Sequence, residues 1–173
     1  MNLVACSEGR HAAAILEILN DAIVNSTALY DYRPRSIETM SAWFQGKADG
    51  GFPVIGAVDQ SAGLLGFATY GTFRALPASK YTVEHSVYVH RDHRRRGIGS
   101  MLMKALIGIA VERQRHVLVG AVDAANVASV ALHESLGFSR CGVIRHAGFK
   151  FGRWLDLAFY QLVLDAPEHP VDG

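Results

Sequence analysis

The sequence predicts a mixed α/β domain built around a single sheet. Apolar residues recur with a helical period in some segments and alternate in others, so both helices and strands are expected. Their order along the chain is β, α, α, β, β, β, α, β, α, β, β, which indicates one mixed sheet with helices packed against it. A chain of 173 residues that is 50% hydrophobic can bury about two thirds of its unfolded surface in a core.

The N-terminal half begins with an apolar run over residues 2–6, which predicts a strand. A helix should follow in "HAAAILEILNDAI", whose apolar residues keep helical spacing. A second helix is predicted in "SIETMSAWFQGKA", with Ser36 as N-cap and Glu38 in its first turn. The segments "PVIGAVD" and "LLGFATYGT" flank the turn "QSAG" and indicate a hairpin.

The C-terminal half opens with a strand over Thr82–Val89. The helix after it has an apolar face formed by Ile98, Met101, Leu102, Ala105, Leu106 and Ile109. A strand in "HVLVGAV", a short helix in "NVASVALHESLGF" that ends at Gly137, and two last strands complete the sheet. We expect one domain over residues 1–165 and a flexible tail over residues 166–173, which has little to bury.

Composition excludes several classes of protein. The formal net charge is +1, whereas general nucleic-acid binders are strongly basic. Cys6 and Cys141 have no CxxC or metal-site spacing, so we expect reduced thiols. No signal peptide or run of about 18 apolar residues is present, which predicts a cytoplasmic protein. His90 and His93 lack a third metal ligand nearby, so no metal is expected.

The most informative stretch is "HRRRGIGSMLMKAL". Gly97 and Gly99 allow a ligand to approach the backbone at a helix start, where unpaired N–H groups favour phosphate. The arginines at 94–96 add forked donors for phosphate oxygens. A dinucleotide fingerprint would need glycine at Leu102, and a P-loop would need Gly-Lys-Ser/Thr. The pattern therefore indicates another kind of phosphate site, or else a merely solvated loop.

The strand before this loop carries one carboxylate, Glu84. Alternation puts Glu84 on one face and His85 on the apolar other face, so His85 is predicted to be a core histidine. A carboxylate in mid-strand is rare unless it has a function or a partner, for which Arg74 is the alternative. His133 should share a helical face with Asn126 and Ser129 or Val130, and a solvated helix position is its alternative.

Two of these motifs together resemble the GNAT superfamily of N-acetyltransferases, namely "RRRGIGS" and "NVASVALHESLGF". "YTVEHSVYV" and "GFKFGRWLDLAFYQL" are similar to segments of the phosphinothricin and methionine sulfoximine acetyltransferases. The resemblance runs from Leu3 to Leu164. It implies the GNAT fold, a mostly antiparallel mixed sheet of about seven strands flanked by about four helices.

The resemblance also implies acetyl-CoA as co-substrate. The backbone of Val87, Tyr88 and Val89 would pair with the pantetheine arm. The pyrophosphate would bind a loop formed by Arg95, Arg96, Gly97, Ile98, Gly99 and Ser100, with a further contact from Asn126. The amine substrate would meet Arg74, Ala75, Leu76, Glu84, His85 and Ser86.

The implied reaction is direct acetylation of the α-amine of a small amino-acid analogue. The amine must lose a proton before it attacks the thioester, and Glu84 is our candidate base. His133 is the candidate acid for the leaving thiolate, with water as the alternative.

The phosphinothricin enzymes have Lys-x-Arg and a Tyr where this chain has Arg74, Leu76 and Ser79, which favours methionine sulfoximine or its sulfone. Alternatives are a protein or peptide N-terminal acetyltransferase and a non-catalytic CoA-binding sensor. The family resemblance also implies a homodimer.

Overall fold

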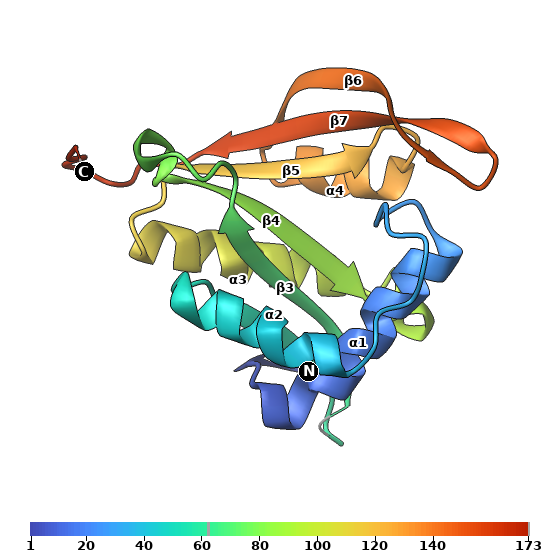
Figure 1. Cartoon of the computed structure of the whole chain (residues 1–173). Helices are drawn as coiled ribbons and strands as arrows, with labels where there is room; N and C mark the ends of the chain where they lie inside the picture. Colours follow the sequence, from blue (N-terminus) through green and yellow to red (C-terminus); the bar gives the residue numbers. More distant parts are fainter. Residues whose placement is uncertain (62, 173) are drawn as a thin grey trace. The chain divides into compact units, whose positions relative to one another are not determined.

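The computed structural model describes residues 1–61 and 63–172. Within them, seven strands form one sheet in the order β1-β2-β3-β4-β5-β7-β6, accompanied by four α-helices (Figure 1). The pairs β1–β2, β2–β3, β5–β7 and β6–β7 are antiparallel, and β4 pairs with β5 in parallel. The predicted fold class and element order are therefore confirmed. The chain divides into two compact units, Met1–Tyr70 with Ser86–Leu106, and Gly71–His85 with Ile107–Gly173.

The elements follow the predicted order along the chain. They are β1 (Asn2–Ala5), α1 (Glu8–Asn25), α2 (Glu38–Asp49), β2 (Val54–Val58), β3 (Leu64–Thr72), β4 (Thr82–Val89), α3 (Ile98–Glu112), β5 (Val117–Asp123), α4 (Val127–Ser135), β6 (Ser139–Lys150) and β7 (Arg153–Val163). Two short 3₁₀ turns, Pro77–Ser79 and Arg91–His93, flank β4.

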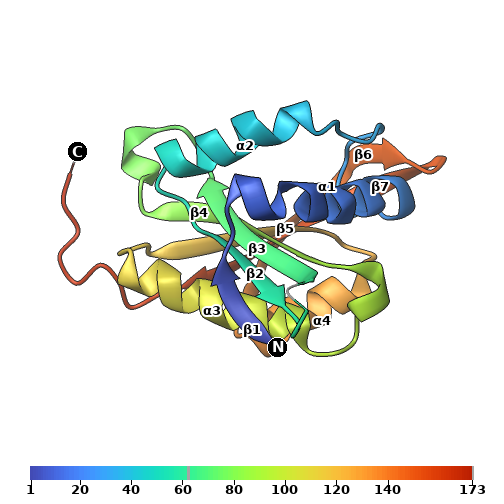
Figure 2. The same ribbon diagram turned by 90° about the horizontal axis from the view of Figure 1, so that it is seen from below.

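In the first unit, α1 and α2 cover one face of β1–β3, and the start of α3 lies on the other (Figure 2). The apolar stripe predicted for α1 is buried here, with Ile15 and Leu19 packed against Met40 of α2 and Phe67 of β3. The helix α2 begins later than predicted: Ile37 takes the N-cap position, and the Ser36 side chain binds the Glu38 side chain instead.

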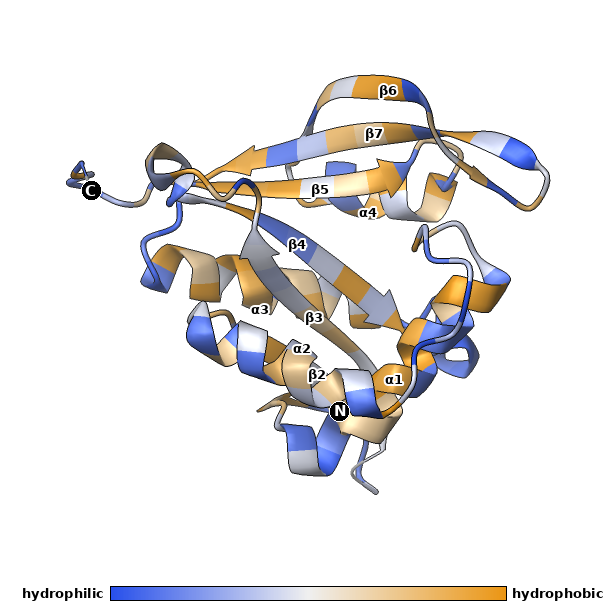
Figure 3. Ribbon diagram, in the orientation of Figure 1, coloured by the Kyte–Doolittle hydropathy of each residue, from blue (hydrophilic) through white to orange (hydrophobic). Residues whose placement is uncertain are grey.

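In the second unit, β5 pairs in parallel with the first residues of β4 and antiparallel with β7, which pairs with β6. Figure 3 shows that β5 is hydrophobic over most of its length. Leu118, Leu155 and Ala158 are buried in this part of the core, and α4 packs on β5. Gly137, with φ of 86°, follows α4, as predicted.

The C-terminal segment makes specific contacts beyond residue 165. Ala166 is buried, and its carbonyl accepts a hydrogen bond from Nδ1 of His116 at 2.8 Å. The backbone N–H of Val171 donates to the hydroxyl of Tyr81 at 3.1 Å. Cys6 and Cys141 are free thiols. Among the residues described, every helix is too short or too polar to span a membrane.

Candidate active site

The loop between β4 and α3 presents backbone donors at a helix start. Gly97 has a φ of 76°, in the left-handed region that favours glycine. The first backbone N–H of α3 that finds an acceptor is that of Met101, which donates to the Gly97 carbonyl at 3.0 Å. Within the described residues, the N–H groups of Ile98, Gly99 and Ser100 have no acceptor. This helix terminus is therefore open to an anion.

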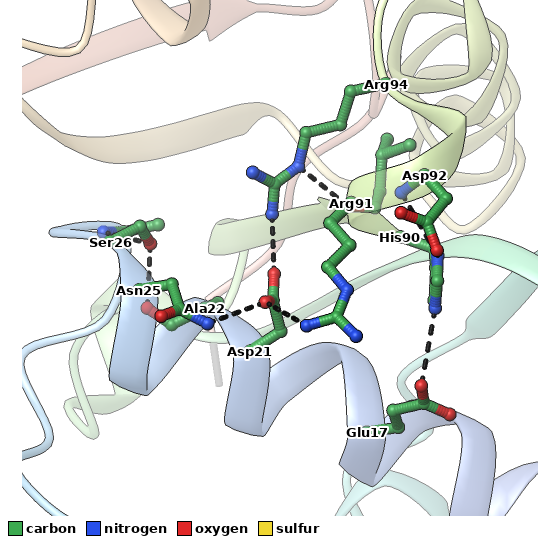
Figure 4. Close-up of polar contacts among 11 residues, drawn as sticks. Glu17, Asp21, Ala22, Asn25, Ser26, His90, Arg91, Asp92 and Arg94 are labelled. Carbon is green, nitrogen blue, oxygen red and sulfur yellow. Dashed lines mark hydrogen bonds and ion pairs between the residues drawn. The ribbon is translucent and has the colours of Figure 1, made fainter.

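The arginines of the loop differ in what they contact. Arg94 is held by α1: Nη2 donates to Asp21 at 2.8 Å, and Nε donates to the Val89 carbonyl at 3.3 Å (Figure 4). Nη1 of Arg96 donates to Nδ1 of His93 at 2.9 Å, and its remaining donors stay exposed. Arg95 is exposed and makes no ion pair with any described residue. Arg95 and Arg96, rather than Arg94, are therefore available to a phosphate.

The strand β4 carries Glu84 in a half-buried position. Its register partner on β5 is Val119, and the ladder between the two strands ends at this pair. Desolvation raises the pKa of the Glu84 carboxyl above its ordinary value. Among the described residues, this carboxylate has no ion-pair partner, so the alternative pairing with Arg74 is not present. Glu84 thus has the burial expected of a general base.

The predicted alternation along β4 is confirmed for its first half. Val83 and His85 are buried, whereas Thr82, Glu84 and Ser86 are only half-buried. After Ser86 the alternation disappears, and Val87–Val89 are all half-buried.

His85 does not sit in the core alone: its Nε2 lies 2.9 Å from Nε2 of His133. Nδ1 of His133 donates to the Ser129 carbonyl at 2.7 Å, so this nitrogen carries the proton of the neutral ring. Nε2 of His133 is then an acceptor, and His85 is the donor. Nδ1 of His85 is buried and has no hydrogen-bond partner among the described residues.

Burial sets the charge of this pair. Desolvation, together with the neighbouring His133, lowers the pKa of His85 to about 3. Desolvation also lowers the pKa of His133. The rings of Phe138 and Tyr160 contact the pair and exclude water. Both histidines are therefore neutral at pH 7. His133 is buried, so the alternative of a solvated helix position does not apply to it.

Gly120 makes room for the two rings. A Cβ at this position would lie 2.6 Å from Nε2 of His133 and 2.8 Å from Cε1 of His85. Sequence reasoning missed this residue, although a glycine inside a strand signals close approach by other groups.

The remaining predicted site residues are Asn126 at the start of α4 and three residues in the loop before β4. Asn126 is the N-cap of α4, and its Oδ1 accepts from the Ser129 N–H at 3.1 Å. Arg74, Ala75 and Leu76 are exposed in the loop before β4. The backbone N–H of Leu76 donates to the Arg74 carbonyl at 2.8 Å.

Residues 1–61 and 63–172 contain no group of three or more acidic, His or Cys side chains that could hold a metal ion.

The chain is a mixed α/β domain, and the open helix terminus after β4 is suited to an anion. Residues 14–138 match the model of the acetyltransferase (GNAT) family. The chain therefore belongs to the GNAT acetyltransferase family.

Relatives with named activities indicate which acetyltransferases of the family this chain resembles. The chain is 45% identical over 151 residues to an L-methionine sulfoximine/L-methionine sulfone acetyltransferase of Pseudomonas aeruginosa, covering 87% of this chain and 88% of that protein. It is 39% identical to the L-amino acid N-acyltransferase MnaT of Escherichia coli, covering 91% of each. Identity is 33% to a phosphinothricin N-acetyltransferase of Alcaligenes faecalis, over 88% of this chain and 78% of that protein.

Solved structures agree with this assignment. An acetyltransferase from Acinetobacter baylyi is 62% identical, with a TM-score of 0.98 over 99% of this chain and 97% of that one. The acetyltransferase yncA of Salmonella typhimurium, solved with its cofactor acetyl-CoA, is 37% identical, with a TM-score of 0.93 over 99% and 98% of the two chains. The resemblance to the methionine sulfoximine and phosphinothricin enzymes is confirmed.

Proposed function

We propose that the protein transfers the acetyl group of acetyl-CoA to the α-amine of a small amino-acid analogue of the methionine sulfoximine, methionine sulfone or phosphinothricin type. The observation that carries this proposal is Glu84, a half-buried carboxylate with a raised pKa and no ion-pair partner among the described residues. It lies on the strand that continues into Val87–Val89 and the phosphate-binding loop. The relatives that are 39–45% identical include L-methionine sulfoximine/L-methionine sulfone acetyltransferases and an L-amino acid N-acyltransferase.

Acetyl-CoA would bind along the second half of β4. The β4–β5 ladder covers only Thr82–Glu84, so β5 does not pair the backbone of Val87–Val89. The amides of the pantetheine arm would pair with that backbone as a neighbouring strand does. The pyrophosphate would accept hydrogen bonds from Arg95, Arg96 and the backbone of 97–100, and Asn126 would add a contact near its helix start.

Glu84 would act as the general base. An α-amine arrives protonated at neutral pH and cannot attack a thioester until the proton is removed. The raised pKa of Glu84 brings this carboxylate closer to the working pH, so it accepts that proton directly or through water. The nitrogen then attacks the thioester carbonyl, and a backbone N–H near Val87 stabilises the oxyanion.

The leaving thiolate must then be protonated, and His133 is the proposed acid. Its only ring proton is on Nδ1 and is donated to the Ser129 carbonyl, while Nε2 accepts from His85, so His133 would have to break the hydrogen bond to Ser129 before it could give up that proton. Water is the other possible donor. Substitution His133→Gln should lower kcat if the ring is the acid, whereas unchanged kcat would leave water as the proton source.

Arg74 would recognise the carboxylate of the substrate. It is an exposed cation without an ion pair to any described residue, in the loop that leads into the Glu84 strand. Leu76, 57% exposed, adds no second charge there, which favours a sulfoximine or sulfone tail over an anionic phosphinate. Ala75, His85 and Ser86 complete the proposed contacts. The His85 ring is buried, so its contribution would come from the backbone.

A thiol-release assay tests the function. Purified protein and acetyl-CoA are incubated with methionine sulfoximine, methionine sulfone, phosphinothricin, ordinary amino acids and peptides with free N-termini. We expect rapid release with the sulfoximine and sulfone and slow release with peptides. Preference for peptides would favour an N-terminal acetyltransferase. CoA binding without turnover of any amine would favour a non-catalytic sensor.

We also propose a homodimer that uses the β6–β7 face. An open groove of about 570 Å³ lies on this sheet, lined by β6 and β7 together with Phe73, Val117 and Val119. Phe149, Phe151 and Trp154 are exposed nearby in sequence. Light scattering should give twice the mass of the chain, and a monomeric mass at assay concentrations would contradict the proposal.

The two free thiols fit a reducing compartment, and we propose the cytoplasm.

A further inference from the structure

The helix α1 contributes a nearly buried carboxylate to the cofactor loop. The Asp21 side chain is 12% exposed and accepts hydrogen bonds from three side chains (Figure 4). Nη2 of Arg94 lies 2.8 Å from its Oδ2. Nη1 of Arg91, at 3.5 Å, and Nδ2 of Asn25, at 2.9 Å, approach its Oδ1. A carboxylate with so many partners and so little exposure is fixed more firmly than one in a surface ion pair.

Arg94 connects the Asp21 carboxylate to the backbone of β4. Its Nε donates to the Val89 carbonyl at 3.3 Å while its Nη2 binds Asp21. Val89 is the last residue of β4, and Arg94 lies three residues before Gly97. Asp21 therefore connects α1 both to the end of β4 and to the loop that precedes α3.

The loop needs such support because its backbone is not in a relaxed conformation. Arg95, directly after Arg94, has a φ of 60°, in the left-handed region that residues with a Cβ rarely adopt. A residue in this region costs free energy and persists only where its surroundings hold it. Arg94 and Arg91 are the neighbours that Asp21 holds.

We propose that Asp21 is a positioning residue for acetyl-CoA: through Arg94 it holds the β4–α3 loop in the shape that presents Arg95, Arg96 and the N–H groups of 98–100 to the pyrophosphate. This inference rests on the proposed function. A loop held in its bound shape before the ligand arrives loses less conformational freedom on binding, so affinity rises. The amine substrate and the chemical step are not affected by this constraint.

Glu17 provides a matched control on the same helix. It also reaches the loop, through His90, but at 3.4 Å and with 65% of its side chain exposed. Such a pair contributes little. Glu17→Gln and Asp21→Asn each remove one negative charge from the same helix, close to the same cluster of arginines.

The experiment measures binding of coenzyme A by calorimetry and steady-state kinetics for wild type, Asp21→Asn, Arg94→Ala, their double variant and Glu17→Gln. We expect Asp21→Asn to weaken coenzyme A binding and raise the KM for acetyl-CoA by about 10-fold. The kcat at saturating acetyl-CoA and the KM for the amine should change less than about 2-fold. Arg94→Ala should weaken binding similarly, and the double variant no further, because both break one connection.

Several results would overturn the proposal. One is an Asp21→Asn variant that binds coenzyme A as tightly as wild type. Another is a Glu17→Gln variant that loses as much affinity as Asp21→Asn, because general charge would then explain the effect. Additive losses in the double variant would separate Asp21 from Arg94. Failure of the wild type to bind coenzyme A would overturn the proposed function itself. Melting temperatures measured with and without coenzyme A check that Asp21→Asn is folded, because ligand binding stabilises only a folded protein.

Discussion

Nε2 of His85 and Nε2 of His133 lie 2.9 Å apart, although 48 residues separate them in the chain. The Ser129 carbonyl holds the proton of His133 on Nδ1, which leaves His85 as the donor between the rings. A second proton on His133 would have to bind Nε2 and would place two donors face to face, whereas a second proton on His85 would charge a ring that is buried from water. The pair therefore makes folding sensitive to pH.

Acid should destabilise the protein through His85. Its pKa is about 3 in the folded protein, below the ordinary value of 6.5. The unfolded chain therefore binds more protons between these values, so stability is complete above pH 6.5 and decreases as the pH falls towards 3. Between pH 7 and pH 5, His85 alone should lower the free energy of unfolding by about 2 kcal/mol. Urea unfolding at several pH values measures this decrease.

The variant His85→Gln isolates the effect. A Gln amide keeps a donor for His133 but does not titrate, so its free energy of unfolding should vary less between pH 7 and pH 5. Glu84, whose folded pKa is raised, acts in the opposite direction in both proteins, so the difference in slope belongs to the histidine. Equal slopes would show that His85 is not a buried neutral ring.

Gly120→Ala should destabilise the fold because the added methyl group meets both rings at less than 3 Å. Overpacking of this kind costs about 2 kcal/mol. Gly142, also in a strand, provides the control, because a Cβ added there would have no atom within 4 Å. Chemical denaturation should give a loss for Gly120→Ala that Gly142→Ala does not reproduce. Equal stability of the two variants would mean that the rings do not lie against β5 as described.

The sequence predicted what depends on local pattern. Helical spacing indicated α1 and α3, alternation put His85 in the core and Glu84 on the other face, and Gly97 indicated the helix start after the loop. The family resemblance pointed to the same loop and to Glu84. In each case the evidence lies within a few neighbouring residues.

The sequence did not predict contacts between distant segments. The alternation on β4 showed that His85 is buried but not that His133 is its partner, because the approach of α4 to β4 depends on the folded sheet. In the same way, Asp21 belongs to the polar side of a helical pattern, and nothing local connects it to Arg94, 73 residues away. The start of α2 at Glu38 depended on which neighbouring group the Ser36 side chain would bind.

The variant with both Arg95 and Arg96 changed to Ala should bind acetyl-CoA at least about 10-fold more weakly, because two cationic donors to the pyrophosphate are lost. Its affinity should also depend less on salt, since fewer charges are left to screen. The melting temperature should hardly change, as Arg95 makes no ion pair with any described residue. Calorimetry at two salt concentrations makes the comparison, with exposed Arg10→Ala as control. Unchanged affinity would favour a solvated loop.

Arg74→Ala should impair substrates that carry a carboxylate. We expect wild type to acetylate methionine sulfoximine with a higher kcat/KM than phosphinothricin, and Arg74→Ala to lower both values by about 10-fold or more. Carboxamide forms of the substrates should be affected little, because they lack the charge that Arg74 binds. Preference for phosphinothricin, or equal penalties for carboxamides and carboxylates, would contradict the assignment of Arg74.

The turnover of Glu84→Gln decides whether Glu84 is the base. The amide keeps the shape of the side chain but cannot accept the amine proton. At saturating acetyl-CoA and methionine sulfoximine, kcat should fall by about 100-fold or more, while calorimetry finds coenzyme A affinity unchanged. Glu112→Gln, at an exposed position on α3, should have wild-type turnover. A kcat for Glu84→Gln close to that of wild type would contradict the proposed mechanism, because another group would then have to take the amine proton.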